Sequence, residues 1–417
     1  MQHPPIHIFE QTPETLGQWC ESQGMPAYRG KQIIEWVYEK HITDPLLMSN
    51  LSRLDREKIA EGVTFSSGFT VAHSRATDGV QKLLVQWKDF AKGQEGGVVA
   101  VRAIPGEACG STVAGDSGTG SIALPILQQS GQRAQGAQGA VESVDEAAVQ
   151  TVLLPEPSDT RRQTECVLIP TDDRKTACIS SQVGCPVGCK FCASGMGGLD
   201  ANLSAGRIVE QVWRLGTLPE IRRVSNVVFM GMGEPLSNFD AVTAAIRTMN
   251  QLWGLGISAR KITISTVGLP KYIKRLRDEF ELPVTLALSL HATNDDLRRQ
   301  LIPWSEFTTI EELLDACHGW FEKTGREITL EYTLLRGVND SPMEAARLAE
   351  LAQTLRANVN LIRYNEVAGI PFSRPKTDDV LQFQQVLRNR NVNVHIRASR
   401  GRDIAAACGQ LRHEHGK

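Results

Sequence analysis

The second half of the chain alternates short apolar segments with amphipathic ones, and this alternation constrains the fold more than any other feature. Six segments have the apolar and β-branched content of buried strands; they are 226–231, 261–266, 284–292, 327–335, 359–365 and 392–398. Between most of them lie segments with helical spacing, such as AGRIVEQVWRL and SPMEAARLAELAQTL. Strands that alternate with helices form parallel sheets covered by those helices. We therefore predict an α/β fold, a complete or partial (β/α) barrel, with its chemistry at the carboxyl ends of the strands.

The first part of the chain has a different pattern. Residues 12–62 carry apolar side chains at three- and four-residue spacing between turn residues, which predicts helices. We assign this small N-terminal helical domain to residues 1–75. Because it contains few strand-like segments, we expect it to form a module of its own.

Two strand-like segments, KLLVQW and TECVLIP, flank a long stretch of unusual composition. That stretch, residues 93–160, is rich in Gly, Ala, Ser and Gln and has neither helical nor strand period. We predict a largely disordered insertion at the tip of a hairpin, since surface loops tolerate long insertions at small entropic cost. The hairpin itself, residues 76–92 and 161–170, leads into the main domain at 171–417.

Charge and hydropathy argue against a membrane-spanning, a secreted or a strongly basic protein. No apolar run approaches the roughly 20 residues that span a bilayer, and the N-terminus MQHPPIHIFE lacks a basic flank before an apolar stretch. We expect a cytoplasmic protein with no membrane partner. The formal charge of -2 gives no global basic signal, so any contact with nucleic acid must come from local patches.

The nine cysteines argue against a disulfide framework and for metal binding or thiol chemistry, because their number is odd and no secretory signal is present. Three of them lie in the segment GCPVGCKFCASG, namely Cys185, Cys189 and Cys192. Thiolates at this Cys-x3-Cys-x2-Cys spacing can hold three irons of a four-iron cubane and leave the fourth open to a substrate. A zinc site requires a fourth protein ligand, which no nearby Cys or His supplies at a usual spacing. We therefore favour a 4Fe-4S cluster over zinc.

This segment resembles the signature of the radical S-adenosylmethionine superfamily, in which an aromatic residue precedes the last cysteine, here Phe191. The resemblance implies that the amino and carboxylate groups of S-adenosylmethionine chelate the open iron. An electron from the cluster then breaks a carbon–sulfur bond and gives a 5′-deoxyadenosyl radical. The cofactor carries this chemistry, and the protein orients it and excludes water.

Five further motifs resemble those of the RlmN/Cfr RNA methyltransferases in the family's order: VVFMGMGEPL, ISTVGLP, LALSLHATND, EYTLLRGVND and RASRGRDIAAACGQL. The agreement covers residues 12–90 and about 162–411. It implies a partial (β/α) barrel of the radical S-adenosylmethionine type. It also implies that S-adenosylmethionine binds to Gly233, Glu234, Ser265, Ser289, Leu290, His291 and Asn339. Singly, such residues are more often structural, and their joint order carries the assignment.

The resemblance also implies an unusual route for the methyl group. Carbon 2 of adenine lies between two electron-withdrawing nitrogens, so transfer of an electrophilic methyl group should fail there. In the family's route Cys408 first takes a methyl group from one S-adenosylmethionine, and a second molecule supplies the radical that activates it. Cys178 then releases the RNA through a transient disulfide with Cys408, and Glu165 is the general acid/base residue. Nearby arginines can lower a thiol pKa, and three lie shortly before Cys408 in the sequence, namely Arg397, Arg400 and Arg402.

The helical module resembles the family's accessory RNA-binding domain. The segment YRGKQIIEWVYEK carries cations and aromatic rings in or beside one helix, at Tyr28, Arg29, Lys31, Trp36 and Lys40. Cations neutralise phosphates, and aromatic rings stack on unpaired bases. The alternative is that Trp36 and Tyr38 belong to the core, with Arg29 and Lys31 on a solvated face.

Taken together, the motifs predict an adenosine carbon-2 methyltransferase. The resemblance implies 23S ribosomal RNA near the peptidyl-transferase centre as substrate, the tRNA anticodon loop as a second substrate, and a flavodoxin or ferredoxin as electron donor. Two alternatives stay open. One is a carbon-8 methyltransferase, which shares nearly all the motifs, and the other is a noncatalytic RNA-binding protein with a structural metal.

Overall fold

The structure is a computed structural model of the 417-residue chain, and it describes residues 1–89, 150–153, 162–221 and 223–411. Apart from 150–153, the predicted insertion at 93–160 lies outside the described residues. Within the described part, one sheet contains 11 strands in the order β13-β12-β11-β10-β9-β8-β5-β4-β2-β1-β3. The first seven strands in this order are parallel and come from residues 175–397. The last four pair in antiparallel fashion and come from residues 68–170.

The first seven strands are parallel to one another. In sequence order they are β5 (Lys175–Cys178), β8 (Asn226–Phe229), β9 (Ile262–Thr266), β10 (Thr285–Ser289), β11 (Ile328–Leu334), β12 (Ala357–Arg363) and β13 (Val394–Arg397). Six of them coincide with the six predicted strands, and β5 is additional. Every residue of β11 is buried, as expected for a strand inside a parallel sheet.

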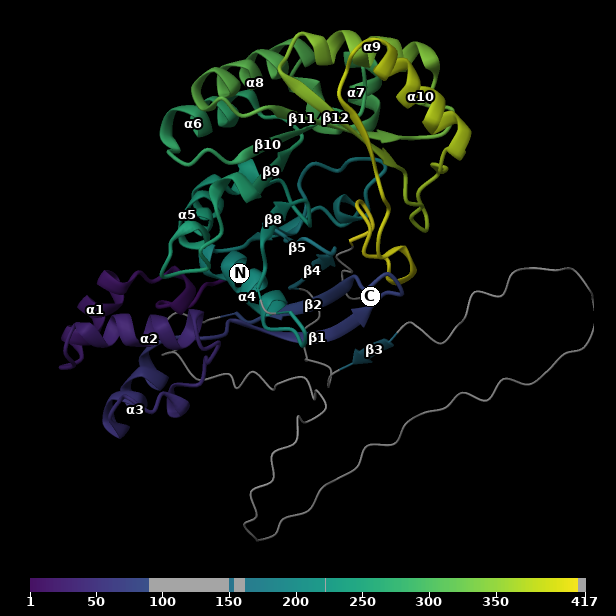
Figure 1. Cartoon of the computed structure of the whole chain (residues 1–417). Coiled ribbons are helices and arrows are strands. Elements are labelled where there is room, and N and C mark those ends of the chain that lie inside the picture. Colours follow the sequence, from purple (N-terminus) through teal and green to yellow (C-terminus); the bar gives the residue numbers. More distant parts are fainter. Residues whose placement is uncertain (90–149, 154–161, 222, 412–417) are drawn as a thin grey trace, which may run out of the picture. The chain divides into compact units, whose positions relative to one another are not determined.

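Helices follow most of these strands and cover one face of the sheet, as Figure 1 shows for α6, α8 and α9. The helices of this region are α4 (Ala205–Gly216), α5 (Phe239–Asn250), α6 (Pro270–Glu279), α7 (Asp295–Leu301), α8 (Ile310–Thr324), α9 (Pro342–Gln353) and α10 (Thr377–Asn389). This is the partial barrel that the alternation predicted. Since the helices lie outside, the inner face and the carboxyl ends of the strands are left for the site.

Local sequence sets the helix ends. Helix α8 begins with a capping box in which the Thr309 and Glu312 side chains each accept a backbone N–H of the other residue. It ends at Gly325, whose φ of 64° is the left-handed conformation that glycine adopts without strain. Helix α9 begins with Ser341 as N-cap followed by Pro342. These signals explain where the two helices begin and where α8 ends.

The other four strands extend the sheet in antiparallel fashion, namely β4 (Gln163–Pro170), β2 (Gln81–Trp87), β1 (Gly68–Arg75) and β3 (Gln150–Leu153). The predicted hairpin is confirmed, because β2 pairs with β4. Two expectations need correction. Strand β1 lies inside the span assigned to the helical domain, since helical spacing stops at residue 62 and the next segment pairs with β2. Strand β3 lies inside the span predicted to be disordered and pairs with β1.

The N-terminal module consists of α1 (Pro13–Ser22), α2 (Tyr28–Tyr38) and α3 (Arg53–Gly62), as predicted. It is tied to α4 by buried polar contacts. His7 Nε2 lies 3.1 Å from Glu210 Oε2, and Trp213 Nε1 donates to the Val37 carbonyl at 2.9 Å. Beside Arg214 and His7, the pKa of Glu210 is held well below its ordinary value despite burial. The module is therefore anchored to the main domain by a charged, fully buried group.

The aromatic residues of α2 divide between core and surface. Trp36 and Tyr38 are buried, and Trp36 Nε1 donates to Asn50 Oδ1 at 2.6 Å, so the alternative that assigned both rings to the core is correct. Tyr28 is 58% exposed, and Lys31 and Lys40 are exposed as well. Any stacking on RNA by this helix would therefore involve Tyr28 and not Trp36.

In the described part of the chain, no helix has the length and apolar character needed to span a membrane.

Candidate active site

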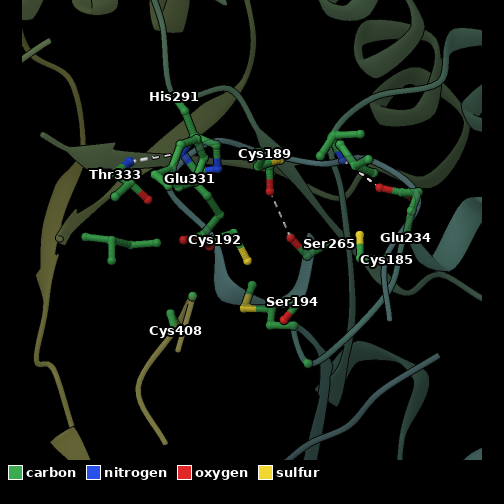
Figure 2. A pocket seen from close by; sticks show the side chains of 18 of the residues that line it. Cys185, Cys189, Cys192, Ser194, Glu234, Ser265, His291, Glu331, Thr333 and Cys408 are labelled. Carbon is green, nitrogen blue, oxygen red and sulfur yellow. Dashed lines mark hydrogen bonds between the residues drawn. The ribbon is translucent and has the colours of Figure 1, made fainter. Parts of the chain in front are cut away.

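A cavity lies at the carboxyl ends of the parallel strands, where the fold predicted the chemistry. It lies between the strands, the loop after β6 and the C-terminal loop, and its empty space of about 900 Å³ includes a part that is open to solvent. Figure 2 shows part of its lining, with Ser265 of β9, His291 just after β10, and Glu331 and Thr333 of β11 around the same space as three cysteines and Cys408. The cavity therefore brings together side chains from residue 185 to residue 409.

A small two-stranded sheet holds the three cysteines in place. Strands β6 (Gln182–Gly184) and β7 (Leu199–Asn202) pair with each other, and the segment between them, residues 185–198, is named here the cysteine loop. Val187 and Phe191 of this loop are buried against Leu301, Ile302 and neighbouring apolar residues. This packing keeps water away from the cysteines, as a radical reaction requires.

The three cysteines are partly buried and share one negatively biased environment. Burial raises the pKa of Cys185 to about 12 and that of Cys189 well above its ordinary value, and the neighbouring thiolates raise both further. Backbone N–H groups of Val187 and Gly233 point at Cys185, and those of Ser194 and Gly195 point at Cys192. A cationic group bound among the sulfurs would neutralise their charges, and N–H groups directed at sulfur are a known feature of iron–sulfur sites.

These donors fit a 4Fe-4S cluster. A cubane takes one thiolate at each of three separate irons, so its ligands need not meet at one point. Among the described residues, no group of three or more His, Cys, Asp or Glu side chains is arranged to hold a single metal ion. The three cysteines nevertheless line one cavity, beside open space large enough for a further ligand.

Glu234 and Gly233 follow β8 and line the cavity as predicted. The Glu234 carboxylate accepts from the backbone N–H groups of Leu236 and Val267, at 3.0 and 2.9 Å. Burial nevertheless raises its pKa to about 7, so a cationic ligand would stabilise its ionised form. Gly233 has a φ of 103°, and a Cβ there would lie 2.7 Å from Ser181 Oγ. Only glycine allows the backbone to approach the cavity in this way.

Three predicted polar side chains line the cavity from the next two strands. Ser265 of β9 and Ser289 of β10 lie side by side, with 3.3 Å between their hydroxyl oxygens. His291 has a φ of 57°, and its Nδ1 accepts the backbone N–H of Thr333 at 3.0 Å. Burial, with Arg298 nearby, lowers the pKa of His291 to about 3. The imidazole is therefore neutral, with its Nε2 hydrogen available to a ligand.

Two other residues predicted to bind S-adenosylmethionine do not line the cavity. Leu290 is fully buried, and its N–H donates to the Glu331 carbonyl at 3.0 Å. Asn339 donates both amide hydrogens to backbone carbonyls, those of His291 at 2.9 Å and Thr333 at 2.8 Å. Its side chain therefore has no donor left for a ribose or an adenine. Both residues instead hold the ends of β10 and β11 that present His291.

A second, smaller cavity adjoins the first. It contains Cys178 of β5, Cys408 of the C-terminal loop and Arg397 of β13. Cys408 lines both cavities, so it connects the cysteine loop to Cys178. The two thiols that sequence separates by half the chain are therefore brought to one place.

The charges around this thiol pair, Cys178 and Cys408, refine the expectation for the arginines. Burial raises the pKa of Cys178 to about 12, a charge on Cys408 raises it further, and Arg397 opposes both. Arg400 also lines this cavity, but its guanidinium donates to the Pro170 carbonyl. Burial thus outweighs the effect of arginine on Cys178, and Arg397 is the arginine that favours its thiolate.

Glu165, the predicted acid/base residue, lies in a separate hollow that is lined in part by the loop that carries Cys408. Its neighbours there include Lys82, Ala405 and Gln410. The Glu165 carboxylate forms an ion pair with Lys82, with 2.6 Å between Oε1 and Nζ. The structure therefore brings Glu165 to the loop that carries Cys408, although not into the two cavities described above.

One acidic residue of the cavity lining was not assigned a role from the sequence. Glu331 is 2% exposed and lies in the middle of β11, whose other residues are uncharged. It also lines the larger cavity. Asn360 donates to its Oε1 at 2.9 Å, and Arg397 Nη1 lies 3.5 Å from Oε2. Burial raises the pKa of Glu331, although Arg397 and Asn360 oppose the rise. A single acidic residue inside a buried strand was the signal that could have identified it.

Comparison with known proteins identifies the family. The chain matches the Radical SAM superfamily over residues 179–349 and the Ribosomal RNA large subunit methyltransferase N-terminal domain over residues 6–64. It is 37% identical over 407 residues to the probable dual-specificity RNA methyltransferase RlmN of Gloeobacter violaceus, covering 97% of this chain and 94% of that protein. The chain belongs to the RlmN family of radical S-adenosylmethionine methyltransferases.

Further relatives of the RlmN family agree. The probable dual-specificity RNA methyltransferase RlmN of Synechococcus sp. (strain CC9311) is 38% identical over 403 residues, 95% of each chain. The crystal structure of a radical SAM methyltransferase from Sphaerobacter thermophilus superposes with a TM-score of 0.78 at 34% identity, covering 98% of this chain and 100% of that one. The predicted family, fold and enzyme class are therefore confirmed: the chain is a radical S-adenosylmethionine RNA methyltransferase of the RlmN family. As a member of this superfamily it uses a 4Fe-4S cluster and S-adenosylmethionine.

Proposed function

We propose that this enzyme methylates carbon 2 of an adenosine in 23S ribosomal RNA, in the peptidyl-transferase region, through an S-methyl group on Cys408. The observation that carries the proposal is the position of Cys408. It lines both the cavity of the cysteine loop and the smaller cavity that holds Cys178. A thiol at this junction can meet a methyl donor on one side and a second thiol on the other.

Cys185, Cys189 and Cys192 would hold the cluster. When bound, the cluster and S-adenosylmethionine supply a 5′-deoxyadenosyl radical and, from a separate S-adenosylmethionine, an electrophilic methyl group, so that each turnover uses two molecules. Glu234 orients the ammonium end of the ligand, because its buried carboxylate is already fixed by two backbone N–H groups.

The nucleoside end meets Ser265, Ser289 and His291, which offer hydrogen bonds to ribose and adenine from the next two strands. Gly233 allows the backbone to approach it. Leu290 and Asn339 act by holding the backbone that presents these side chains, since Leu290 binds the Glu331 carbonyl and Asn339 binds the carbonyls of His291 and Thr333. The apolar packing of the cysteine loop excludes water from the same space.

The two thiols of the pair have separate roles. Cys408 acts first, as a nucleophile that accepts a methyl group and then carries the activated carbon to carbon 2 of the base. Cys178 acts afterwards by attacking the Cys408 sulfur, which forms a transient disulfide and releases the methylated RNA. Its buried thiol stays protonated until then, and Arg397 favours the thiolate that the attack requires. Glu165, beside the same loop, is the general acid/base residue for the base.

The family match supports the proposed substrates. The relatives described above are named dual-specificity RNA methyltransferases, which supports the tRNA anticodon loop as a second substrate beside 23S ribosomal RNA. The RlmN N-terminal domain supports an RNA contact by residues 6–64. A flavodoxin or ferredoxin supplies the electron for the cluster, and ribosomal RNA as substrate implies a cytoplasmic enzyme.

The test is the identity of the modified carbon. Anaerobically reconstituted protein is incubated with protein-free 23S ribosomal RNA or tRNA, and the RNA is digested to nucleosides for mass spectrometry. The expected product is 2-methyladenosine. Exclusive formation of 8-methyladenosine would overturn the carbon-2 assignment, and a colourless zinc-containing protein without methylation would overturn the enzyme itself.

A further inference from the structure

A buried ion pair lies beside the Cys408 loop. Lys82 on β2 and Glu165 on β4 are joined by 2.6 Å between Nζ and Oε1, and their side chains are only 14% and 10% exposed. The strand register sets Leu84 opposite Glu165. Lys82, two residues from Leu84, therefore points to the same face and reaches Glu165 diagonally.

The same ammonium also reaches the loop that carries Cys408. Lys82 Nζ donates to the Ala405 carbonyl at 3.3 Å. Ala405 has a φ of 49°, which is unusual for a residue with a side chain, and it precedes Cys408 by three positions. Lys82, Glu165 and Ala405 line one hollow. A single ammonium thus links the carboxylate to the backbone of the reactive loop.

The loop does not depend on Lys82 alone for its place. Asp403 accepts the Thr77 N–H at 2.9 Å, and Asp78 accepts the Gly401 N–H at 3.0 Å. Both contacts fix the loop to the turn between β1 and β2, without involving Glu165. The Lys82 contact differs from them because the side chain that binds the loop also binds Glu165.

We propose that Lys82 is a positioning residue for the methyl transfer to RNA, holding the Glu165 carboxylate at a fixed distance from Cys408. The inference rests on the proposed function and assigns to it a residue that neither the sequence motifs nor the family match supplied. A lysine suits this position because its three N–H donors form a compact charge that can serve a carboxylate and a carbonyl together. Misplacement of a catalytic group by about 1 Å can slow a reaction about 100-fold, so the contact has a measurable consequence.

The test compares four forms of the full-length reconstituted enzyme: wild type, Lys82→Met, Glu165→Gln and the double variant. Two quantities are measured separately. The first is methylation of Cys408 by S-adenosylmethionine without RNA, read by peptide mass spectrometry. The second is the single-turnover rate of RNA methylation. Lys82→Arg is added as the conservative replacement, and Lys82→Gln replaces Lys82→Met if the latter does not fold.

We expect Cys408 methylation to be unchanged in Lys82→Met and RNA methylation to fall about 10- to 100-fold. Lys82→Arg should recover a substantial part of the rate. The double variant should be no slower than Glu165→Gln, because Lys82 acts through Glu165 and the two losses do not multiply. A wild-type rate in Lys82→Met, or a double variant whose loss is the product of the two single losses, would overturn the proposal.

Asp403→Ala provides the matched control, since it removes another contact of the same loop without touching Glu165. Its effect should multiply with that of Glu165→Gln. If the effect of Lys82→Met also multiplies with that of Glu165→Gln, Lys82 is merely structural and the proposal fails. Failure of the proposed function itself looks different, because the wild type would then give no RNA product at all.

Discussion

The cysteine loop and the thiol pair place five cysteines around connected cavities, but they are built in opposite ways. The cysteine loop takes its three thiols from one short segment between β6 and β7. The thiol pair takes Cys178 from a strand of the sheet and Cys408 from the C-terminal loop, and the two meet only because the sheet brings β5 and that loop together. The difference teaches that cluster binding is encoded locally, whereas the second thiol function depends on the complete fold.

The largest effect is expected in the cysteine loop. Cys192→Ser should lose the cluster, because a three-thiolate site has no ligand to spare, and RNA methylation should be undetectable. Iron analysis and visible absorption of anaerobically purified protein measure this directly. If the variant keeps both iron and activity, the cysteine loop is not the cluster site.

The matched change in the thiol pair should leave the cluster intact. Cys178→Ala removes the thiol that releases the RNA, so the reaction should stop with RNA bound covalently through Cys408. A protease-sensitive RNA adduct on a denaturing gel is the expected sign, together with wild-type iron content. Free methylated RNA at the wild-type rate, with no adduct, would contradict the role of Cys178.

A smaller effect is expected at Glu234, which lines the larger cavity. Glu234→Gln should weaken binding of S-adenosylmethionine about 10- to 100-fold, since a hydrogen bond to a charged group contributes about 1.5–3 kcal/mol. Equilibrium binding to the cluster-loaded protein measures the change. Asp240→Asn makes the same chemical replacement at a carboxylate whose side chain is 85% exposed, and it should bind as the wild type does. Equal affinities for both variants would exclude Glu234 from the ligand site.

The smallest effect concerns the reactivity of Cys178. Burial raises its pKa to about 12 and Arg397 opposes the rise, so less thiolate is present at neutral pH than for an ordinary cysteine. The alkylation rate of Cys178 should increase with pH from 7 to beyond 9, and Arg397→Met should slow it a few-fold at each pH. Arg402→Met, which changes an exposed arginine of the loop that carries Cys408, is the control. Faster alkylation in Arg397→Met would show that the sign is wrong.

The same contrast explains how much could be predicted from the sequence. The strands of the partial barrel and the cysteine loop are read from residues close together in the chain, and both were found. The pairing of Lys82 with Glu165 depends on the register of β2 and β4, which composition does not fix. Strand β1 was assigned to the helical domain because a partly exposed antiparallel strand has a weaker apolar pattern than the buried strand β11.

Residue roles show a similar limit. The motifs pointed to Asn339, and the structure shows that its amide hydrogens are used by backbone carbonyls. They assigned no role to Glu331, although it stands alone as an acidic residue in a strand-like segment; its contacts with Asn360 and Arg397 became visible only in the packed sheet. Sequence therefore located the site, and the fold determined which side chains face it.

The most direct measurement follows the fate of the methyl hydrogens. The enzyme is supplied with S-adenosylmethionine whose methyl group carries three deuterium atoms, and the methylated adenosine is analysed by mass spectrometry. Transfer through Cys408 removes one deuterium as the S-methyl group is activated, so the product should retain two. A product that retains all three would mean direct transfer, and it would contradict the role of Cys408.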